Sequence, residues 1–289
     1  MVDVFKLEMH PSKKLTYRFN DQWLKLEKRP IWLKVKLGGI VIPVKKTTYW
    51  SVAGATLKSK NGEFYAVKFG ANERIRVGEQ WYRMNKARNF TEFYKAISLN
   101  QAAKYNIVYA DKNDTVFFIN NALVPKRNPD FNYREVVATN STYSLWTEFH
   151  ETKDLVQYVN PKSGYVFNTN NLPTNATAKE DQRKITEWPD YFGFDRDMGD
   201  NNRAERFMEL LGYSNKLTFE RMKEIKFDYE VKSCSKFYKS IEDLLNLDPS
   251  KYPDVSDLQA EVVKWDGCAD RYSLGAGVFL LAFQIYLTN

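Results

Sequence analysis

Residues 158–173 read YVNPKSGYVFNTNNLP, and this stretch decides how the rest of the chain is interpreted. It combines an Asn-Pro turn, a Lys-Ser-Gly turn, a short apolar run and a pair of asparagines that ends in proline. The apolar run at residues 165–167 predicts a short strand. An amide held at the end of a strand can keep its NH2 group aimed at a reacting oxygen.

The composition is that of a globular protein. The 289 residues are 43% hydrophobic, 27% charged and 15% aromatic, which suits strands and large buried surfaces. The formal net charge is +7, but Lys and Arg are spread along the chain. We interpret the charge as a solvated surface and expect no nucleic-acid partner, because no basic run concentrates contacts to phosphate.

The chain has few residues that bind zinc. Cys234, Cys268, His10 and His150 are its only cysteines and histidines, so a zinc site of the usual ligands is not expected. The two cysteines are compatible with one bridge or with free thiols.

Neither end shows a targeting or membrane-spanning pattern. The first residues, MVDVFKLEMH, have no signal-peptide features. The apolar end from Ser273 is shorter than the roughly 20 residues that cross a bilayer, and it predicts a buried helix. Because the chain starts in a strand pattern and stops in an apolar helix, we expect it to be an internal piece of a longer protein.

Strand patterns dominate the first half. Residues 31–37 alternate in polarity and lead through Gly38-Gly39 into IVIPV, which predicts a β-hairpin. A further strand is predicted at 64–69, and a second hairpin at 106–120, followed by a polar loop at 128–144.

Helical spacing appears at residues 90–97, where Asn89 is the predicted N-cap and Glu92 follows three residues later. Residues 175–184 are interpreted as a solvated loop, and helices are expected from residue 201 onward.

The predicted helices carry apolar stripes. Their members are Phe207, Leu210 and Leu211, then Met222, Ile225 and Tyr229 behind the predicted cap Thr218, then Phe237, Ile241, Leu244 and Leu245. Strands first and helices later predict an α+β fold. We expect residues 1–174 to be β-rich with one helix, and residues 175–289 to be mainly helical within the same domain.

A series of segments, taken in order, resembles one known family. The segments are VDVFKLEMHP (2–11), YRFNDQWLKLEKR (17–29), MNKARNFTEFYKAI (84–97), NIVYADKND (106–114), VPKR (124–127), NPKSGYVFNTNNLP (160–173), RAERFMELL (203–211), LTFERMKEIKFD (217–228) and WDGCADRYS (265–273). In this order they resemble the penicillin amidase superfamily of N-terminal-nucleophile hydrolases, which includes acyl-homoserine-lactone acylases. The segment at 160–173 is the most specific match.

The resemblance implies a four-layer α-β-β-α sandwich and hydrolysis of the amide between an acyl group and an amine. In that family the nucleophile is the first residue of a β chain released by self-cleavage, and its own α-amine is the base. The family is periplasmic or secreted and needs no organic cofactor. The implied partners are an acylated amine substrate, an α chain, and the part of the β chain that bears the nucleophile.

The resemblance also assigns site residues. Asn170 matches the family's side-chain donor to the oxyanion, and Arg203 matches its active-site arginine, with Arg206 as a nearby alternative. Asn170 could instead satisfy the backbone of a turn, and Arg203 could pair with Glu205 or Glu209. A structural calcium ion is implied at Asp3 and the backbone of Val2, with Asp181 as a further ligand.

Two departures from the family pattern affect the function. Ser51-Val52-Ala53-Gly54-Ala55 stands where a Ser/Thr-x-His-Gly-Pro run is usual, and the nucleophile is expected to precede Met1. The chain alone is therefore expected to be inactive. The alternative is a non-catalytic binding module that has kept the acylase scaffold.

Overall fold

The computed structural model describes residues 1–72, 74–194, 199–212, 217–231 and 242–288, and it confirms the expected α+β class. The chain forms two compact units, Met1–Asn168 with Pro173–Arg196, and Thr169–Leu172 with Asp197–Asn289. We describe each unit by itself, and the domain boundary expected at residue 174 stays a prediction.

The first unit contains a six-stranded sheet with the order β10-β1-β7-β6-β5-β4. Its strands are β1 (Val2–Leu7), β4 (Glu27–Leu37), β5 (Ile40–Ser51), β6 (Gly54–Lys58), β7 (Phe64–Phe69) and β10 (Val137–Thr139). The hairpin predicted around Gly38-Gly39 is β4–β5, and the strand predicted at residues 64–69 is β7. Strand β10 was not predicted, since it lies in the polar loop and pairs in parallel with β1.

The core of this sheet follows from alternation along β1. Phe5 and Leu7 are buried on one face, while Lys6 between them is exposed. Tyr17 lies in the same core and comes from a separate small hairpin, β2 (Thr16–Phe19) with β3 (Gln22–Lys25). Trp146 completes the core from the connection beyond β10.

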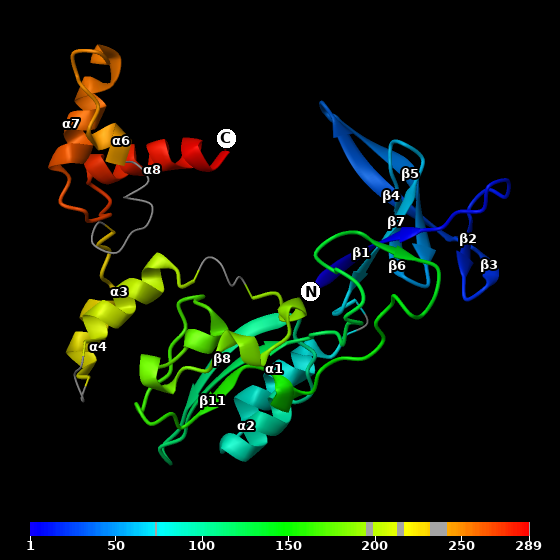
Figure 1. The fold of residues 1–289 in the computed structure, drawn as a ribbon, viewed down its shortest axis with the longest axis horizontal. Helices are drawn as coiled ribbons and strands as arrows, with labels where there is room; N and C mark the ends of the chain where they lie inside the picture. The colour runs from blue at the N-terminus through cyan, green and yellow to red at the C-terminus, as the bar shows by residue number, and fades with distance from the viewer. Residues whose placement is uncertain (73, 195–198, 213–216, 232–241, 289) are drawn as a thin grey trace. The chain divides into compact units, whose positions relative to one another are not determined.

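A second sheet has the order β11-β9-β8 and packs beside two helices (Figure 1). The elements are β8 (Lys104–Ala110), β9 (Val116–Ala122), β11 (Gln157–Val159), α1 (Val77–Lys86) and α2 (Phe90–Ile97). The predicted hairpin and helix are confirmed. Asn89 caps α2 by accepting from the backbone of Glu92, and the ring of Phe93 lies 4.5 Å from that of Tyr109 in β8.

Short 3-10 helices connect the remaining parts of the first unit. They are η1 (Thr152–Asp154), η2 (Pro173–Asn175), η3 (Lys179–Asp181), η4 (Ile185–Glu187) and η5 (Asp190–Phe192). The second unit contains α3 (Asn202–Leu211), α4 (Phe219–Lys226), α6 (Glu242–Leu245), η6 (Pro253–Val255), α7 (Ser256–Lys264) and α8 (Leu274–Thr288). Thr218 caps α4 as predicted. Phe237 and Ile241 of the third predicted stripe, and Cys234, lie outside the described residues.

Helix α8 is the helix predicted at the apolar end, but the prediction that it is buried was only partly correct. Ala276 and Phe279 are buried beside Val262 and Trp265, whereas Leu280 and Leu281 are 58% and 65% exposed. Within the described ranges, no helix has both the length and the apolar character needed to cross a membrane.

The packing of α8 on α7 depends on Gly275. A Cβ atom at this position would lie 2.4 Å from the Cβ of Trp265 and 2.8 Å from the carbonyl oxygen of Glu261. We expect Gly275→Ala to lower the free energy of unfolding of this unit by about 1–3 kcal/mol, because the two helices must move apart. Denaturant unfolding followed by tryptophan fluorescence measures the change.

Gly277 provides a matched control in the same helix. No heavy atom lies within 4 Å of its would-be Cβ. Gly277→Ala is expected to raise stability by about 0.5–1 kcal/mol, through helix propensity alone. Equal effects of the two substitutions would show that the close approach at Gly275 does not matter for packing.

Candidate functional site

The segment that decided the sequence interpretation starts at β11. Asn160 follows this strand with a positive φ of 47°, and its side chain accepts from the backbone of Val116 at 2.7 Å. Gly164 adopts a φ of 76° in the next turn, a conformation that glycine enters readily. Both turns predicted from the sequence are therefore present, and they direct the chain toward the paired asparagines.

The strand predicted at residues 165–167 was wrong. The backbone N–H of Phe167 donates to the carbonyl of Ala176 at 2.9 Å, and the hydroxyl of Thr177 donates to the carbonyl of Tyr165 at 2.8 Å. These contacts hold the segment without a strand ladder. Ala176 and Thr177, which make these contacts, are fully buried. The prediction of a solvated loop at residues 175–184 was therefore wrong for its first part.

Asparagine side chains anchor the loop on the second sheet. Asn120 of β9 donates to the side chain of Asn106 in β8 at 2.7 Å, and Asn106 donates to that of Asn168 at 3.0 Å. The sheet thereby fixes Asn168, the last residue before the 169–172 segment. A strand at residues 165–167 was expected to hold the Asn170 amide in place. The contact between Asn106 and Asn168 does part of this instead.

Asn170 lies at the turn of the segment, with a φ of 58°, a region in which Asn is tolerated better than most residues. Its neighbour Asn171 is buried, and the Asn171 side chain accepts from the backbone of Thr169 at 3.0 Å and donates to the carbonyl of Leu172 at 3.0 Å. Asn171 therefore serves the backbone of the turn, and Asn170 has its side chain on the exposed side.

Within the second unit, the start of α3 holds residues 169–172. The side chain of Asn201, the N-cap residue of α3, donates to the carbonyl of Thr169 at 3.1 Å and accepts from the backbone of Ala204. Asp200 accepts from the backbone of Leu172 at 3.3 Å. These bonds place the first turn of α3 against residues 169–172.

Arg203, in that first turn, reaches Asn170. Its Nη2 donates to Oδ1 of Asn170 at 3.1 Å, and both side chains are exposed. Because a guanidinium can only donate, this bond fixes which amide atom faces the arginine. The oxygen of Asn170 faces Arg203, and its NH2 group lies on the other side of the amide. The structure thus brings together the two residues assigned to catalysis; their roles are not tested by this geometry.

Arg206, the nearby alternative, is engaged elsewhere. Its guanidinium contacts Asp228 at 2.9 Å, Glu230 at 2.6 Å and Glu209 at 3.1 Å, and its side chain is 16% exposed. The hydrogen bond to Asp228 is the main cause that raises the pKa of Arg206. Arg206 joins α3 to the segment after α4, and Arg203 is the arginine that meets Asn170.

The residues predicted to bind calcium have other contacts. Both oxygens of buried Asp3 accept from the guanidinium of Arg127 at 2.8 Å, and Oδ2 also accepts from the indole of Trp146 at 2.6 Å. A calcium ion would have to share this carboxylate with a positive charge. Asp181 accepts from the backbone of Ser163 at 2.7 Å, and Val2 lies in the β1–β7 ladder.

No group of three or more His, Cys, Asp or Glu side chains in the described part of the chain is placed to hold a metal ion. The carboxylate of Asp3 is engaged by Arg127 and Trp146, so we derive no step through a calcium ion. Calcium binding at Asp3 stays a prediction, and the neighbours that the structure gives Asp3 are Arg127 and Trp146. The Pro-x-Arg segment that ends at Arg127 was the signal in the sequence that could have drawn attention to Arg127 as the partner of Asp3.

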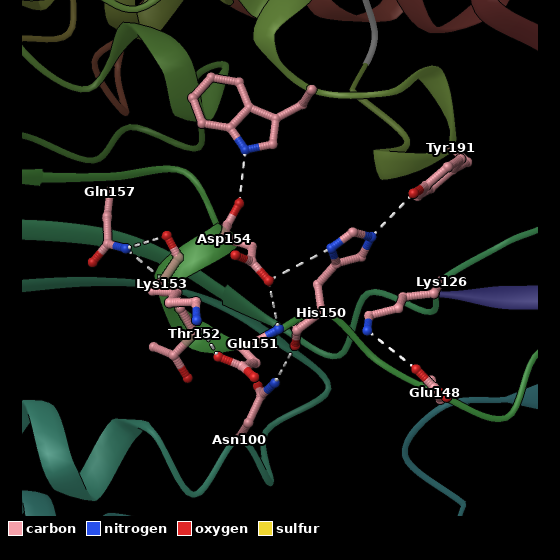
Figure 2. Close-up of polar contacts among 11 residues, drawn as sticks. Asn100, Lys126, Glu148, His150, Glu151, Thr152, Lys153, Asp154, Gln157 and Tyr191 are labelled. Carbon is pink, nitrogen blue, oxygen red and sulfur yellow. Dashed lines mark hydrogen bonds and ion pairs between the residues drawn. The ribbon is translucent and has the colours of Figure 1, made fainter.

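A second polar group surrounds His150 in the first unit, and Figure 2 shows its contacts. The Nε2 atom of His150 lies 3.0 Å from the hydroxyl of Tyr191, and its Nδ1 atom lies 3.8 Å from Oδ2 of Asp154. Asp154 closes a capping box with Glu151 at η1, and its carbonyl accepts from the indole of Trp188. The histidine therefore joins the η1 turn to η5.

Burial lowers the pKa of His150 below the ordinary value of 6.5, and Lys126 adds to this effect, while Asp154 opposes it. A group whose pKa is lower in the folded state is neutral there more often than in the unfolded state. We expect its contribution to stability to be complete above about pH 6.5 and to fall as the pH drops below that value.

Urea unfolding at a series of pH values tests this expectation. The slope of stability against pH below 6.5 should decrease in His150→Gln, and His10→Gln is the matched control because it leaves His150 in place. An unchanged slope in His150→Gln would contradict the assignment.

The chain is similar to several known proteins. The fold is similar to that of the thermostable penicillin G acylase from Alcaligenes faecalis, with a TM-score of 0.67 and 22% identity, over 93% of this chain and 46% of that chain. The chain is 26% identical over 135 residues to the acyl-homoserine lactone acylase PvdQ of Pseudomonas fluorescens (strain Pf0-1), covering 44% of this chain and 17% of that protein.

The penicillin G acylase of Escherichia coli is also 26% identical, over 179 residues, covering 60% of this chain and 20% of that protein. The chain thus spans a fifth or less of the length of these two curated relatives. The model of the family described as penicillin amidase matches residues 1–288. The chain therefore belongs to the penicillin amidase family.

Proposed function

We propose that this chain contributes the charge-stabilising part of an acylase active site, in which Asn170 binds the oxyanion and Arg203 holds the Asn170 amide in place. The observation that carries the proposal is the 3.1 Å bond from Arg203 Nη2 to Asn170 Oδ1. This bond presents the NH2 group of Asn170, a neutral donor, on the side away from the guanidinium.

The proposed reaction is hydrolysis of an amide between an acyl group and an amine. Attack on the carbonyl carbon moves negative charge onto the carbonyl oxygen, and a donor already in place stabilises that charge without rearrangement. The nearby guanidinium adds a positive charge, which acts on the same oxygen through the amide. Neither group needs to change protonation state during the step.

The nucleophile in this proposal comes from polypeptide outside the 289 residues, together with an acyl-binding α chain. The mechanism requires a hydroxyl or thiol and a free α-amine on the same residue, so an internal serine cannot replace it. The proposed substrates are acylated amines, as the names of the curated relatives indicate. We extend the family's periplasmic or secreted location to this protein as part of the proposal.

The first test compares the chain alone with the chain plus the nucleophile-bearing segment of its own precursor, on phenylacetyl and long-chain acyl anilides that release a coloured amine. We expect no turnover by the chain alone and turnover by the reconstituted assembly. Turnover by the isolated chain that survives Asn170→Ala would contradict the proposal.

Arg203 is tested in the active assembly. Arg203→Met removes the bond that orients the Asn170 amide but keeps the length of the side chain. We expect kcat to fall about 10- to 100-fold with little change in KM, because the bond matters most when charge develops. Arg203→Lys should restore part of kcat, since a lysine can still donate to the amide oxygen.

A binding module without activity is the second candidate, and the segment Ser51–Ala55 favours it. Here the tight turn between β5 and β6 holds Val52 and Ala53 where the family usually has Ser/Thr-x-His-Gly-Pro. The backbone of Val52 donates to the hydroxyl of Tyr17 at 3.1 Å, and that of Ala53 donates to Ser51 at 3.2 Å. Ligand binding with no hydrolysis, even in the reconstituted assembly, would favour this candidate.

A further inference from the structure

The β4–β5 hairpin carries a run of exposed apolar residues in the first unit. Its strands pair from Glu27 opposite Trp50 to Leu37 opposite Ile40, and every residue of β4 is exposed. In the described sheet, β6 pairs only with the last three residues of β5, which are residues 49–51. Figure 1 shows the closed end of the hairpin projecting beyond the other strands of its sheet.

The closed end of the hairpin is apolar. Leu37, Ile40 and Val41 are 61%, 69% and 56% exposed, and Gly38-Gly39 between them add no polar side chain. The exposed large apolar residues of the hairpin are Ile31, Trp32, Leu33, Val35, Leu37, Ile40, Val41, Ile42 and Val44. An apolar surface of this kind on a protein marks a place of interaction.

Basic residues and a tryptophan follow behind the apolar end. They are Lys28, Arg29, Trp32, Lys34, Lys36, Lys45 and Lys46, which we call the collar. Glu27 is the one acidic residue between positions 27 and 51, and it pairs with Arg29 at 2.9 Å. Trp32 is 66% exposed, and the Nζ atom of Lys45 lies 5.8 Å from the centre of its ring.

We propose that this hairpin binds the surface of an anionic lipid bilayer. Behind the apolar end come Lys36 opposite Val41, Lys34 opposite Pro43, and Trp32 opposite Lys45. The apolar end suits the hydrocarbon of one leaflet, and the basic residues and Trp32 behind it suit the phosphates and the interface. Lys36, close to the end, can extend its ammonium group back toward the phosphates. Insertion is shallow, about 5–10 Å, because the edges of the hairpin keep backbone groups that need water.

The charge of the collar favours lipid over a second copy of the chain. Two hairpins that met through their apolar ends would bring two collars of the same sign together, which opposes association. An anionic surface instead attracts every basic residue of the collar. The proposal is independent of hydrolysis, so lipid binding and turnover can fail separately.

The test is cosedimentation of the 289-residue protein with vesicles of phosphatidylcholine alone, or with about one-third phosphatidylglycerol. We expect binding to the anionic vesicles and little to the neutral ones. Leu37→Asp combined with Ile40→Asp should abolish binding. Lys34→Gln combined with Lys45→Gln should weaken it about tenfold or more, since each basic residue near the surface adds to the attraction.

Leu57→Asp is the matched control, because Leu57 in β6 of the same sheet is 63% exposed, close to the 61% of Leu37. It should bind like the unchanged protein. Binding that does not depend on phosphatidylglycerol or on the apolar end would overturn the proposal. An absence of vesicle binding would overturn it too. This includes the outcome in which the protein self-associates instead and the Leu37→Asp, Ile40→Asp double variant is dispersed.

Discussion

Replacing Asn170 by alanine is expected to lower kcat of the active assembly about 100- to 1000-fold, the usual effect of losing one oxyanion donor. The loss should appear in kcat more than in KM, because the amide acts on charge that is present only in the transition state. Steady-state hydrolysis of a chromogenic acyl anilide measures both constants.

Two further variants separate the amide from the backbone at this position. Asn170→Asp keeps the shape of the side chain but puts negative charge beside the developing oxyanion, so it should lose at least as much activity. Asn170→Gly accepts the φ of 58° without strain and should be as inactive as Asn170→Ala.

Asn168→Ala is the matched control, two residues away and also exposed. It loses the contact with Asn106 that anchors the loop but keeps the amide at position 170, so it should lose clearly less activity than Asn170→Ala. If Asn168→Ala and Asn170→Ala lost equal activity, the effect would come from the loop as a whole and not from the Asn170 amide.

Replacing Asp3 by alanine is expected to lower the free energy of unfolding of the first unit by about 3–5 kcal/mol. In the unchanged protein the side chains of Arg127 and Asp3 are only 6% and 2% exposed. The substitution therefore leaves the guanidinium of Arg127 buried without its carboxylate. The rings of Tyr133 and Tyr191 and the carbonyl of Tyr191 remain beside the charge, but they do not neutralise it. Urea unfolding measures the loss.

A double variant tests whether the charge is the cause. Asp3→Leu combined with Arg127→Met removes both charges and should recover most of the stability lost in Asp3→Ala, because apolar replacements of a buried pair are often neutral. The exposed pair of Glu27 and Arg29 is the control, and Glu27→Ala should leave stability nearly unchanged. A double variant that is as unstable as the single one would contradict this account.

Local sequence signals predicted the elements that depend on local structure. The Gly38-Gly39 turn between alternating runs, and Asn89 three residues before Glu92, specify a hairpin and a capped helix within one short segment. The structure confirms both. Such signals carry their own hydrogen bonds and turn geometry, so distant parts of the chain change them little.

Long-range pairing set the elements that were missed. Strand β10 exists because residues 137–139 meet β1 more than a hundred residues away in the sequence. Residues 165–167 have the composition of a strand, but Ala176 and Thr177 satisfy the backbone there instead. Neither partner can be read from the local pattern.

In the candidate site, too, the long-range contacts could not be predicted from local sequence. Asn170 and Arg203 were chosen through the family resemblance, and no spacing rule predicts that residues 33 positions apart share a hydrogen bond. Asp3 was also chosen through the resemblance, as a calcium ligand, and its contact with Arg127, 124 positions away, could not be predicted from the sequence. A buried carboxylate must have some positive partner, but the sequence alone does not say which.

The most direct test of the central claim measures binding of a tetrahedral transition-state analogue and of a product acid to the active assembly, with and without Asn170→Ala. If the amide stabilises the oxyanion, affinity for the analogue should fall by the same factor as kcat/KM, and affinity for the product acid should stay nearly unchanged. An analogue that binds both proteins equally well would contradict the role proposed for Asn170.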